Sequence, residues 1–185
     1  MDDLTGKILV AMPNIGDTRF ARSVILMCTH SDEYAMGLVL NDPIKDLFLA
    51  DLFEQLDIEQ NIKLPETYVL NGGPVSRDRG FVIHSDDYFC DGATMEVTER
   101  LCMTATHDVL VSIASGGAPA QSIMTLGYSG WGAGQLEHEL SENAWIVTEP
   151  DDDLVFGDQY DQKWERSLQL MGISSAHLLS GGGTA

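Results

Sequence analysis

The stretch from Gly127 to Leu140 constrains the fold of this chain more than any other part of the sequence. It follows an apolar run at residues 122–126 and leads into an amphipathic pattern, which predicts a strand, a glycine-rich turn and a short helix. Glycine allows positive φ angles and close approach of the backbone to another surface. Two large aromatic residues with polar tips, Tyr128 and Trp131, stand between the glycines. We therefore expect either a core junction or a recognition surface here.

The rest of the chain alternates between short apolar runs and single amphipathic segments. Strands are predicted at residues 7–13, 23–28, 36–40, 67–70, 81–84, 95–101, 144–148 and 154–156. Helices are predicted after the cap residues Asp46, Thr106 and Asp158. Because the helices do not alternate regularly with strands, we expect an α/β fold with a mixed sheet and helices outside it. The 185 residues are predicted to form one domain, with residues 180–185 as a frayed tail.

Net charge argues against one class of partner. The chain has 29 carboxylates and ten Lys and Arg, for a formal charge of −19, and the basic residues never form a stripe. A nucleic-acid surface needs basic groups to neutralise phosphates, so direct binding of nucleic acid is disfavoured. The same field would steer a basic partner protein toward the chain. High negative charge that simply aids solubility is the alternative explanation.

Three features of the sequence predict a cytoplasmic protein. No apolar run approaches the ~20 residues that a membrane span requires, so no membrane partner is expected. The first residues are acidic where a secretory signal would be basic. The three cysteines are odd in number and lack C-x-x-C spacing, which is typical of a reducing compartment.

Several catalytic or cofactor-binding patterns are present only in part. Ser129 lies in a sequence that lacks the last glycine of a nucleophile elbow. A dinucleotide-binding G-x-G-x-x-G would need glycine where Gln135 stands, and the His138 segment lacks the second histidine of a zinc motif. Cys102 and His107 are close in sequence, but their geometry is not predictable. We therefore predict no catalytic residue, no metal and no cofactor.

A second glycine-rich loop has the composition of a small-ligand site. Its residues are Asn71, Gly72, Gly73 and Pro74. Free N–H groups in such a loop can form an anion-binding nest, and Arg77 and His84 follow it. A ligand cleft would lie between residues 71–75 and 127–135, with Gln135 and Glu137 as further polar groups. A plain turn whose arginines pair with nearby aspartates is the alternative.

Seven segments in order resemble the AlgH/YqgE family of bacterial proteins. They are residues 7–13, 17–24, 35–41, 71–75, 78–84, 127–137 and 143–145, and the resemblance covers nearly the whole chain. It implies a single α/β domain whose bifurcated mixed sheet forms a partial barrel flanked by helices. Members are labelled transcriptional regulators, through one association with alginate control, without an established biochemical activity. The chain departs from the family at Asp42, where Lys or Arg is usual, and at Thr184, where His is common.

The sequence thus predicts a non-enzymatic binding or regulatory protein that acts through protein contacts. Its recognition surface would contain Tyr128, Trp131 and the helix at 135–139, because aromatic side chains with a polar rim suit an interface anchor. A small-ligand protein or enzyme that uses the cleft described above is the first alternative. The second is transcriptional regulation, direct or indirect. The loss of a positive group at Asp42 further weakens direct DNA binding.

Overall fold

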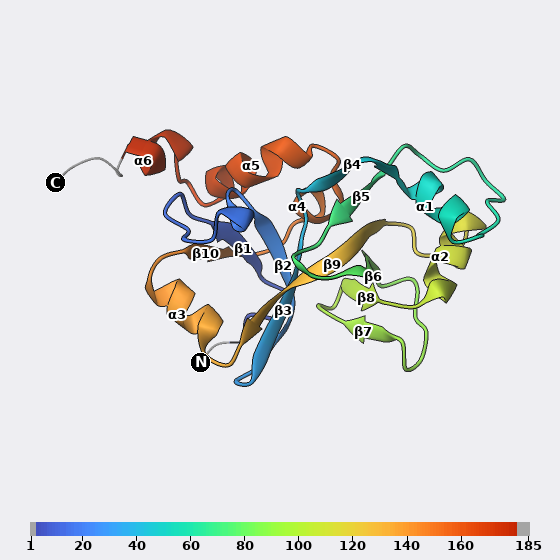
Figure 1. Cartoon of the computed structure of the whole chain (residues 1–185), viewed down its shortest axis with the longest axis horizontal. Coiled ribbons are helices and arrows are strands. Elements are labelled where there is room, and N and C mark those ends of the chain that lie inside the picture. The colour runs from blue at the N-terminus through green and yellow to red at the C-terminus, as the bar shows by residue number, and fades with distance from the viewer. Residues whose placement is uncertain (1–2, 181–185) are drawn as a thin grey trace. The chain divides into compact units, whose positions relative to one another are not determined.

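The computed structural model describes residues 3–180 (Figure 1). Of the predicted tail at 180–185, residues 181–185, which include Thr184, lie outside the described residues, whereas Ser180 is the last residue of a helix. The chain forms two compact units. Unit 1 comprises Met1–Asn41 and Gly130–Ala185, and unit 2 comprises Asp42–Ser129. That the chain acts as one domain stays a prediction.

Unit 1 contains an antiparallel sheet in the order β10-β1-β2-β3. Its strands are β1 (Ile8–Ala11), β2 (Val24–His30), β3 (Tyr34–Val39) and β10 (Trp145–Thr148). All four residues of β1 are buried, as the uninterrupted apolar run at 7–13 predicts for a strand covered on both faces. The predicted strands at 7–13, 23–28, 36–40 and 144–148 are confirmed.

The helices of unit 1 correct two predictions. They are α3 (Gln135–Ser141), α4 (Asp152–Phe156), α5 (Lys163–Leu170) and α6 (Ser175–Ser180), with short 3₁₀ turns η1 (Thr18–Phe20) and η2 (Tyr160–Gln162). The predicted strand at 154–156 is wrong, because Asp151 caps a helix there by accepting a hydrogen bond from the Leu154 N–H at 2.7 Å. The predicted cap Asp158 is also wrong, since the N-cap of α5 is Gln162.

Unit 2 contains a mixed sheet that branches at β9. Its strands are β4 (Pro43–Phe48), β5 (Tyr68–Asn71), β6 (Val75–Ser85), β7 (Thr94–Glu96), β8 (Leu101–Thr104) and β9 (Ser122–Gly132), whose last three residues belong to unit 1. Thr125 of β9 pairs with Phe81 of the antiparallel β6 and with Leu70 of the parallel β5. Strands β8 and β7 continue beyond β6, and β4 pairs with β5.

Two helices complete unit 2, in which two predictions are wrong and one strand was not predicted. The helices are α1 (Leu49–Gln55) and α2 (His107–Ala114), the latter with the predicted N-cap Thr106. Asp46 does not cap α1; it lies in the unpredicted strand β4 with φ +57°, and Asp51 accepts the hydrogen bond from the Phe48 N–H instead. The predicted strand at 95–101 is two strands, β7 and β8. Thr98 separates them, because its hydroxyl accepts from the Leu101 N–H and forms a turn.

The glycine-rich stretch is mainly a strand, which corrects the predicted turn. β9, orange in Figure 1, runs without interruption through residues 127–132. Pairing with distant strands supplies the hydrogen bonds, as in the register of Tyr128 with Val75. The turn is reduced to Ala133 and Gly134, where Gly134 adopts φ +72° as the N-cap of α3.

Candidate functional site

A bulge in β6 is the feature of unit 2 that most resembles a binding site. Between Val75 and Gly80, β6 advances by five residues, whereas β9 advances by only two, from Tyr128 to Leu126. Three additional residues therefore protrude from the ladder. The protruding segment, residues 76–79, is exposed, and Ser76 within it adopts φ +46°. We call this segment the β6 bulge. Such strained, irregular strand segments are found preferentially at functional sites.

Two glycines allow the backbone to cross beneath the β6 bulge. A Cβ on Gly73 would overlap the peptide that joins Tyr128 and Ser129. A Cβ on Gly127, which has φ +72°, would lie 2.6 Å from the Gly73 carbonyl oxygen and 3.3 Å from the Arg77 Cα. The two glycine-rich motifs therefore pack backbone against backbone and form the base of the bulge. Residue 73 therefore packs directly against residues 127–129, in the region where the small-ligand alternative places its cleft.

The loop that precedes the bulge has its polar groups occupied. The Asn71 side-chain amide donates to Asp42 at 2.8 Å, so Asp42 holds this residue in place. The Gly72 N–H donates to the Leu126 carbonyl at 2.8 Å, and the Gly72 carbonyl accepts from the Ser129 hydroxyl at 3.2 Å. Gly73 is buried and Pro74 is half-buried. Because the Gly72 N–H already has a partner, it is not available to the predicted anion nest.

Two arginines and a tyrosine form a surface over this base. Arg77 and Arg79 are exposed, and Tyr128 is half-buried. The Arg79 guanidinium carbon lies 5.3 Å from the centroid of the buried Phe81 ring, whose edge packs against Tyr128 at 5.8 Å. We call Arg77, Arg79 and Tyr128 the bulge surface. The sequence assigned Arg77 and Tyr128 to two separate sites. Arg79 was missed as a site residue, although its spacing of two from Phe81 places both on one face of a strand.

The guanidinium groups of the bulge surface are free of carboxylates. Among the described residues, neither Arg77 nor Arg79 forms an ion pair. In unit 1, by contrast, Lys7 pairs with Glu149, Arg19 with Asp17, Arg22 with Glu165 and Arg166 with Asp153. The alternative in which the two loop arginines pair with nearby aspartates therefore does not hold. Ten hydrogen-bond donors of two guanidinium groups remain for a partner.

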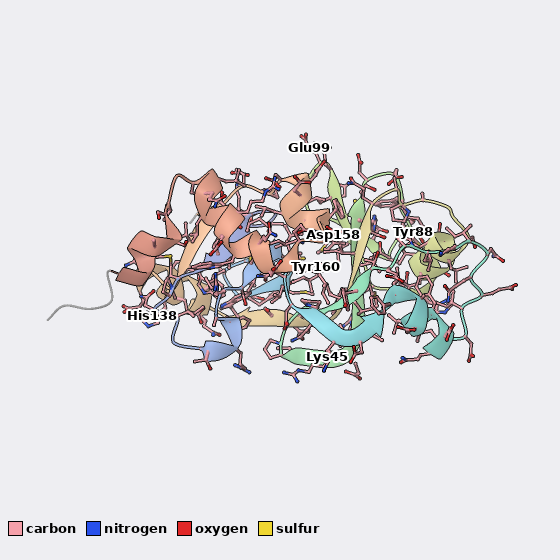
Figure 2. The ribbon with its side chains drawn as sticks, turned by 90° about the horizontal axis from the view of Figure 1, so that it is seen from above. Lys45, Tyr88, Glu99, His138, Asp158 and Tyr160 are labelled. Atoms are coloured by element: carbon pink, nitrogen blue, oxygen red, sulfur yellow. The ribbon has the colours of Figure 1, made fainter. Side chains whose placement is uncertain are left out.

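His84 is a buried structural residue. Its Nδ1–H donates to the Ser85 carbonyl at 2.8 Å, so its Nε2 accepts from the Thr104 hydroxyl at 2.8 Å. Thr94 completes the chain by a 2.8 Å hydrogen bond to Thr104. The ring of Tyr88, labelled in Figure 2, packs edge-on against the imidazole. Burial lowers the pKa of His84, which favours the neutral form that this chain requires. A ligand cannot reach the ring in this conformation.

Trp131 belongs to the core of unit 1. It is 4 % exposed, and its Nε1–H donates to Glu139 at 2.9 Å. The Trp145 indole donates to the same Glu139 oxygen at 2.7 Å, and the Gln135 amide donates to the other oxygen at 3.0 Å. The Phe20 ring stacks on Trp131. A single carboxylate therefore accepts hydrogen bonds from both indole N–H groups. The polar groups of these two tryptophans are thus used inside unit 1 and not at its surface.

Glu137 also has a partner within unit 1. Its carboxylate accepts from His30 Nε2 at 2.8 Å, because His30 Nδ1 is occupied as the acceptor of the Leu4 N–H at 3.1 Å. This hydrogen bond lowers the pKa of Glu137. Gln135, besides its bond to Glu139, accepts from the Gly132 N–H. Of the polar side chains in the predicted recognition surface, those of Tyr128 and His138 therefore form no internal hydrogen bond among the described residues.

The candidate nucleophiles are buried. Ser129 is fully buried and donates to a backbone carbonyl. Burial raises the pKa of the Cys28 thiol to about 12 and also raises that of Cys102. A thiol protonated in this way is a poor nucleophile. Neither the serine nor these cysteines can attack a substrate in this structure.

Two other classes of site are not found among residues 3–180. No helix in this part of the chain is long and apolar enough to cross a membrane. Within the same residues, no three or more His, Cys, Asp and Glu side chains gather in an arrangement that could hold a metal ion.

Comparison with known sequences defines the family. The AlgH-like family model matches residues 8–176, so the chain belongs to the AlgH-like family. A UPF0301 protein of Bradyrhizobium diazoefficiens is 46% identical over 98% of this chain and 88% of its own length. A UPF0301 protein of Caulobacter vibrioides is 42% identical over 98% of this chain and 94% of its own.

Solved structures agree with this assignment. The solution structure of AlgH from Pseudomonas aeruginosa is similar, with a TM-score of 0.77 and 37% identity over 99% of this chain and 96% of that one. The crystal structure of protein DIP2367 from Corynebacterium diphtheriae has a TM-score of 0.73 over 92% of this chain and 88% of that one. At 20% identity the latter shows the fold alone. The predicted class, an α/β fold with a mixed, branched sheet and helices, is confirmed.

Proposed function

We propose that the chain is a non-enzymatic binding protein that recognises a protein partner through the bulge surface. The observation that carries this proposal is the pair of exposed arginines, Arg77 and Arg79, which stand on a strand bulge without carboxylate partners. The two arginines lie only two residues apart on this bulge, in a chain with 29 carboxylates and ten Lys and Arg. Arginine and tyrosine are the residue types that most often dominate the binding energy of protein interfaces.

The bulge surface is well ordered for binding. The Arg79 guanidinium rests on the Phe81 ring, and Phe81 in turn supports Tyr128. Backbone packing of Gly73 against residues 127–129 leaves the base of the bulge little freedom to move. A side chain that is already held in place loses less conformational entropy when a partner binds. The same packing explains how the two glycine-rich motifs contribute to function without contacting the partner.

The chemistry of the surface indicates what the partner presents. Planar guanidinium groups bind carboxylates in bidentate geometry, and a half-buried tyrosine ring contacts apolar side chains. A phosphate backbone is a poor alternative, since unit 2 contains five Lys and Arg against 14 carboxylates. We propose a protein segment with local Asp or Glu residues. An overall basic partner would be steered by the net charge of −19 and still offer such a segment.

A regulatory role and a cytoplasmic location are part of this proposal. A protein that binds another without chemistry acts by changing the partner's activity or availability. If the partner is a transcription factor, the effect on transcription is indirect. The free cysteines Cys28, Cys90 and Cys102 support the cytoplasmic location.

Affinity capture from native lysate tests the proposal, with two double variants beside the wild type. Arg77→Ala/Arg79→Ala removes the guanidinium groups of the bulge surface. Lys45→Ala/Lys63→Ala removes the same charge from exposed positions of the same unit. The partner is the protein retained by the wild type and the lysine variant but lost from the arginine variant. Its purified form should show the same pattern in titrations, with circular dichroism confirming the fold of each variant. Equal retention by all three proteins would contradict the proposal.

A further inference from the structure

A pocket in unit 2 lies on the side of the sheet covered by α1 and α2. It has a volume of about 280 Å³. Leu52 of α1 and Leu56, the C-cap of that helix, line it on one side. Leu110 lines it from α2, and Val82 and Met124 line it from β6 and β9. We call it the α1–α2 pocket. Its size lies near the lower end of the range for small-molecule sites.

The interior of the α1–α2 pocket is apolar. Val82, Leu110 and Met124 are buried core residues. The hydroxyl of Thr104, which also lines the pocket, is already bonded to His84 and Thr94. A ligand body that enters the pocket therefore meets hydrocarbon, and burial of apolar surface supplies its binding energy.

One charged group lines the pocket. Asp78 belongs to the β6 bulge, lines the α1–α2 pocket and is exposed to solvent. Among the described residues it has no ion pair or hydrogen bond, whereas Asp87 accepts from the Ser85 hydroxyl and the Ala120 N–H. No Lys or Arg lines the pocket. The His107 imidazole and the Thr106 hydroxyl are further polar groups of its lining, and the Thr106 side chain forms no capping hydrogen bond to α2.

From this arrangement we infer that the α1–α2 pocket binds small organic amines, with the apolar body among the leucines and the ammonium group at Asp78. Arg77 and Arg79 flank Asp78 in the chain, but among the described residues neither forms an ion pair with it and neither lines the pocket. On the pocket side the carboxylate is therefore available to a positive group and repels an anion. The hydroxyl of Thr106 offers the ammonium group a second acceptor. The inference rests on different side chains from those of the bulge surface, so each can fail without the other.

Three probes of similar shape and different charge test the inference. Phenethylamine is cationic at neutral pH, phenethyl alcohol is neutral, and hydrocinnamate is anionic. Titration followed by ¹H–¹⁵N NMR should show amine binding strongest and hydrocinnamate binding weakest, with shifts at residues of α1, α2 and β6. Equal affinity for the three probes, or no binding at millimolar concentration, would overturn the inference.

Variants locate the two ends of the ligand. Asp78→Asn should weaken amine binding by about fivefold, the upper range for an exposed ion pair, and leave alcohol binding unchanged. Asp91→Asn, at an exposed position outside the pocket, is the matched control. Leu56→Ala should weaken both probes, because Leu56 forms part of the apolar wall and is exposed enough to be replaced without unfolding. If Asp78→Asn leaves the affinity for the amine unchanged, the ion pair between Asp78 and the ammonium group is refuted. The Arg77→Ala/Arg79→Ala variant should still bind the amine.

Discussion

Replacement of Lys163 by Met should change the stability of the chain in a manner that depends strongly on pH. Lys163 is 2 % exposed, and its Nζ atom has one hydrogen bond, of 3.3 Å, to the Val155 carbonyl. Burial lowers its pKa from 10.5 to about 8, although Asp158 and Asp151 partly oppose this shift. Asp158 is labelled in Figure 2. The charged form of Lys163 is therefore less favourable in the folded chain than in the unfolded one.

The size of the effect follows from the two pKa values of Lys163. A lowering from 10.5 to about 8 corresponds to a cost of about 3 kcal/mol when the group is charged in both states. This full cost applies below pH 8. Between pH 8 and 10.5 the unfolded chain binds more protons than the folded chain, so the stability of the wild type rises with pH. We therefore expect the stability of Lys163→Met relative to wild type to fall by about 2 kcal/mol between pH 7 and pH 10.

Urea unfolding followed by tryptophan fluorescence measures this difference at several pH values. Burial raises the pKa of the Cys28 thiol from 9.0 to about 12, which also makes stability depend on pH, but it does so in both proteins and therefore cancels in the difference. Lys45→Met, at an exposed position, is the control and should show a difference that does not vary with pH. A constant difference for Lys163→Met as well would refute the reasoning, because it would mean that the pKa of Lys163 is the same in both states.

Three further predictions concern interactions within each of the two units. Glu139→Gln should destabilise unit 1 by about 1–3 kcal/mol, because it weakens an acceptor shared by two buried indoles, whereas the exposed Glu142→Gln should have little effect; thermal unfolding with tryptophan fluorescence measures both. Gly73→Ala should cost more than about 2 kcal/mol in urea unfolding, because its Cβ overlaps backbone, while Gly92→Ala, with open space around it, should cost about 1 kcal/mol. The hydrogen bond that lowers the pKa of Glu137 contributes stability that is fully present above its unfolded pKa of 4.5 and is lost as pH falls through the lower folded value, so Glu137→Gln should flatten this part of the acid-unfolding curve.

Elements whose signal is local could be predicted from the sequence. The continuous apolar run around β1 indicates a strand buried on both faces whatever it pairs with. Thr106 at the N-cap, Asp108 in the first turn and an apolar stripe indicate α2, because these signals lie within a few residues of one another. The family and the fold class could also be predicted, because the motifs that define them occur in a fixed order along the chain.

Elements that depend on distant partners could not be predicted. Residues 127–132 look like a flexible turn, yet they form a strand because a distant segment pairs with Tyr128. β4 contains Pro43 and Asp46, both unfavourable in a strand, and exists because β5 pairs with it. Propensity is a weak signal when the alternative conformation has inter-strand hydrogen bonds to gain.

The candidate site, too, could be predicted only in part from the sequence. The sequence alone indicated that Arg77 and Tyr128 were unusual residues, because arginine is rare in this chain and aromatic residues seldom stand among glycines. It could not show that they share one surface, that Trp131 lies in the core or that Asp78 lines a pocket. Residue type is a property of the chain, whereas burial and proximity arise only when the register between β6 and β9 places three extra residues in the bulge.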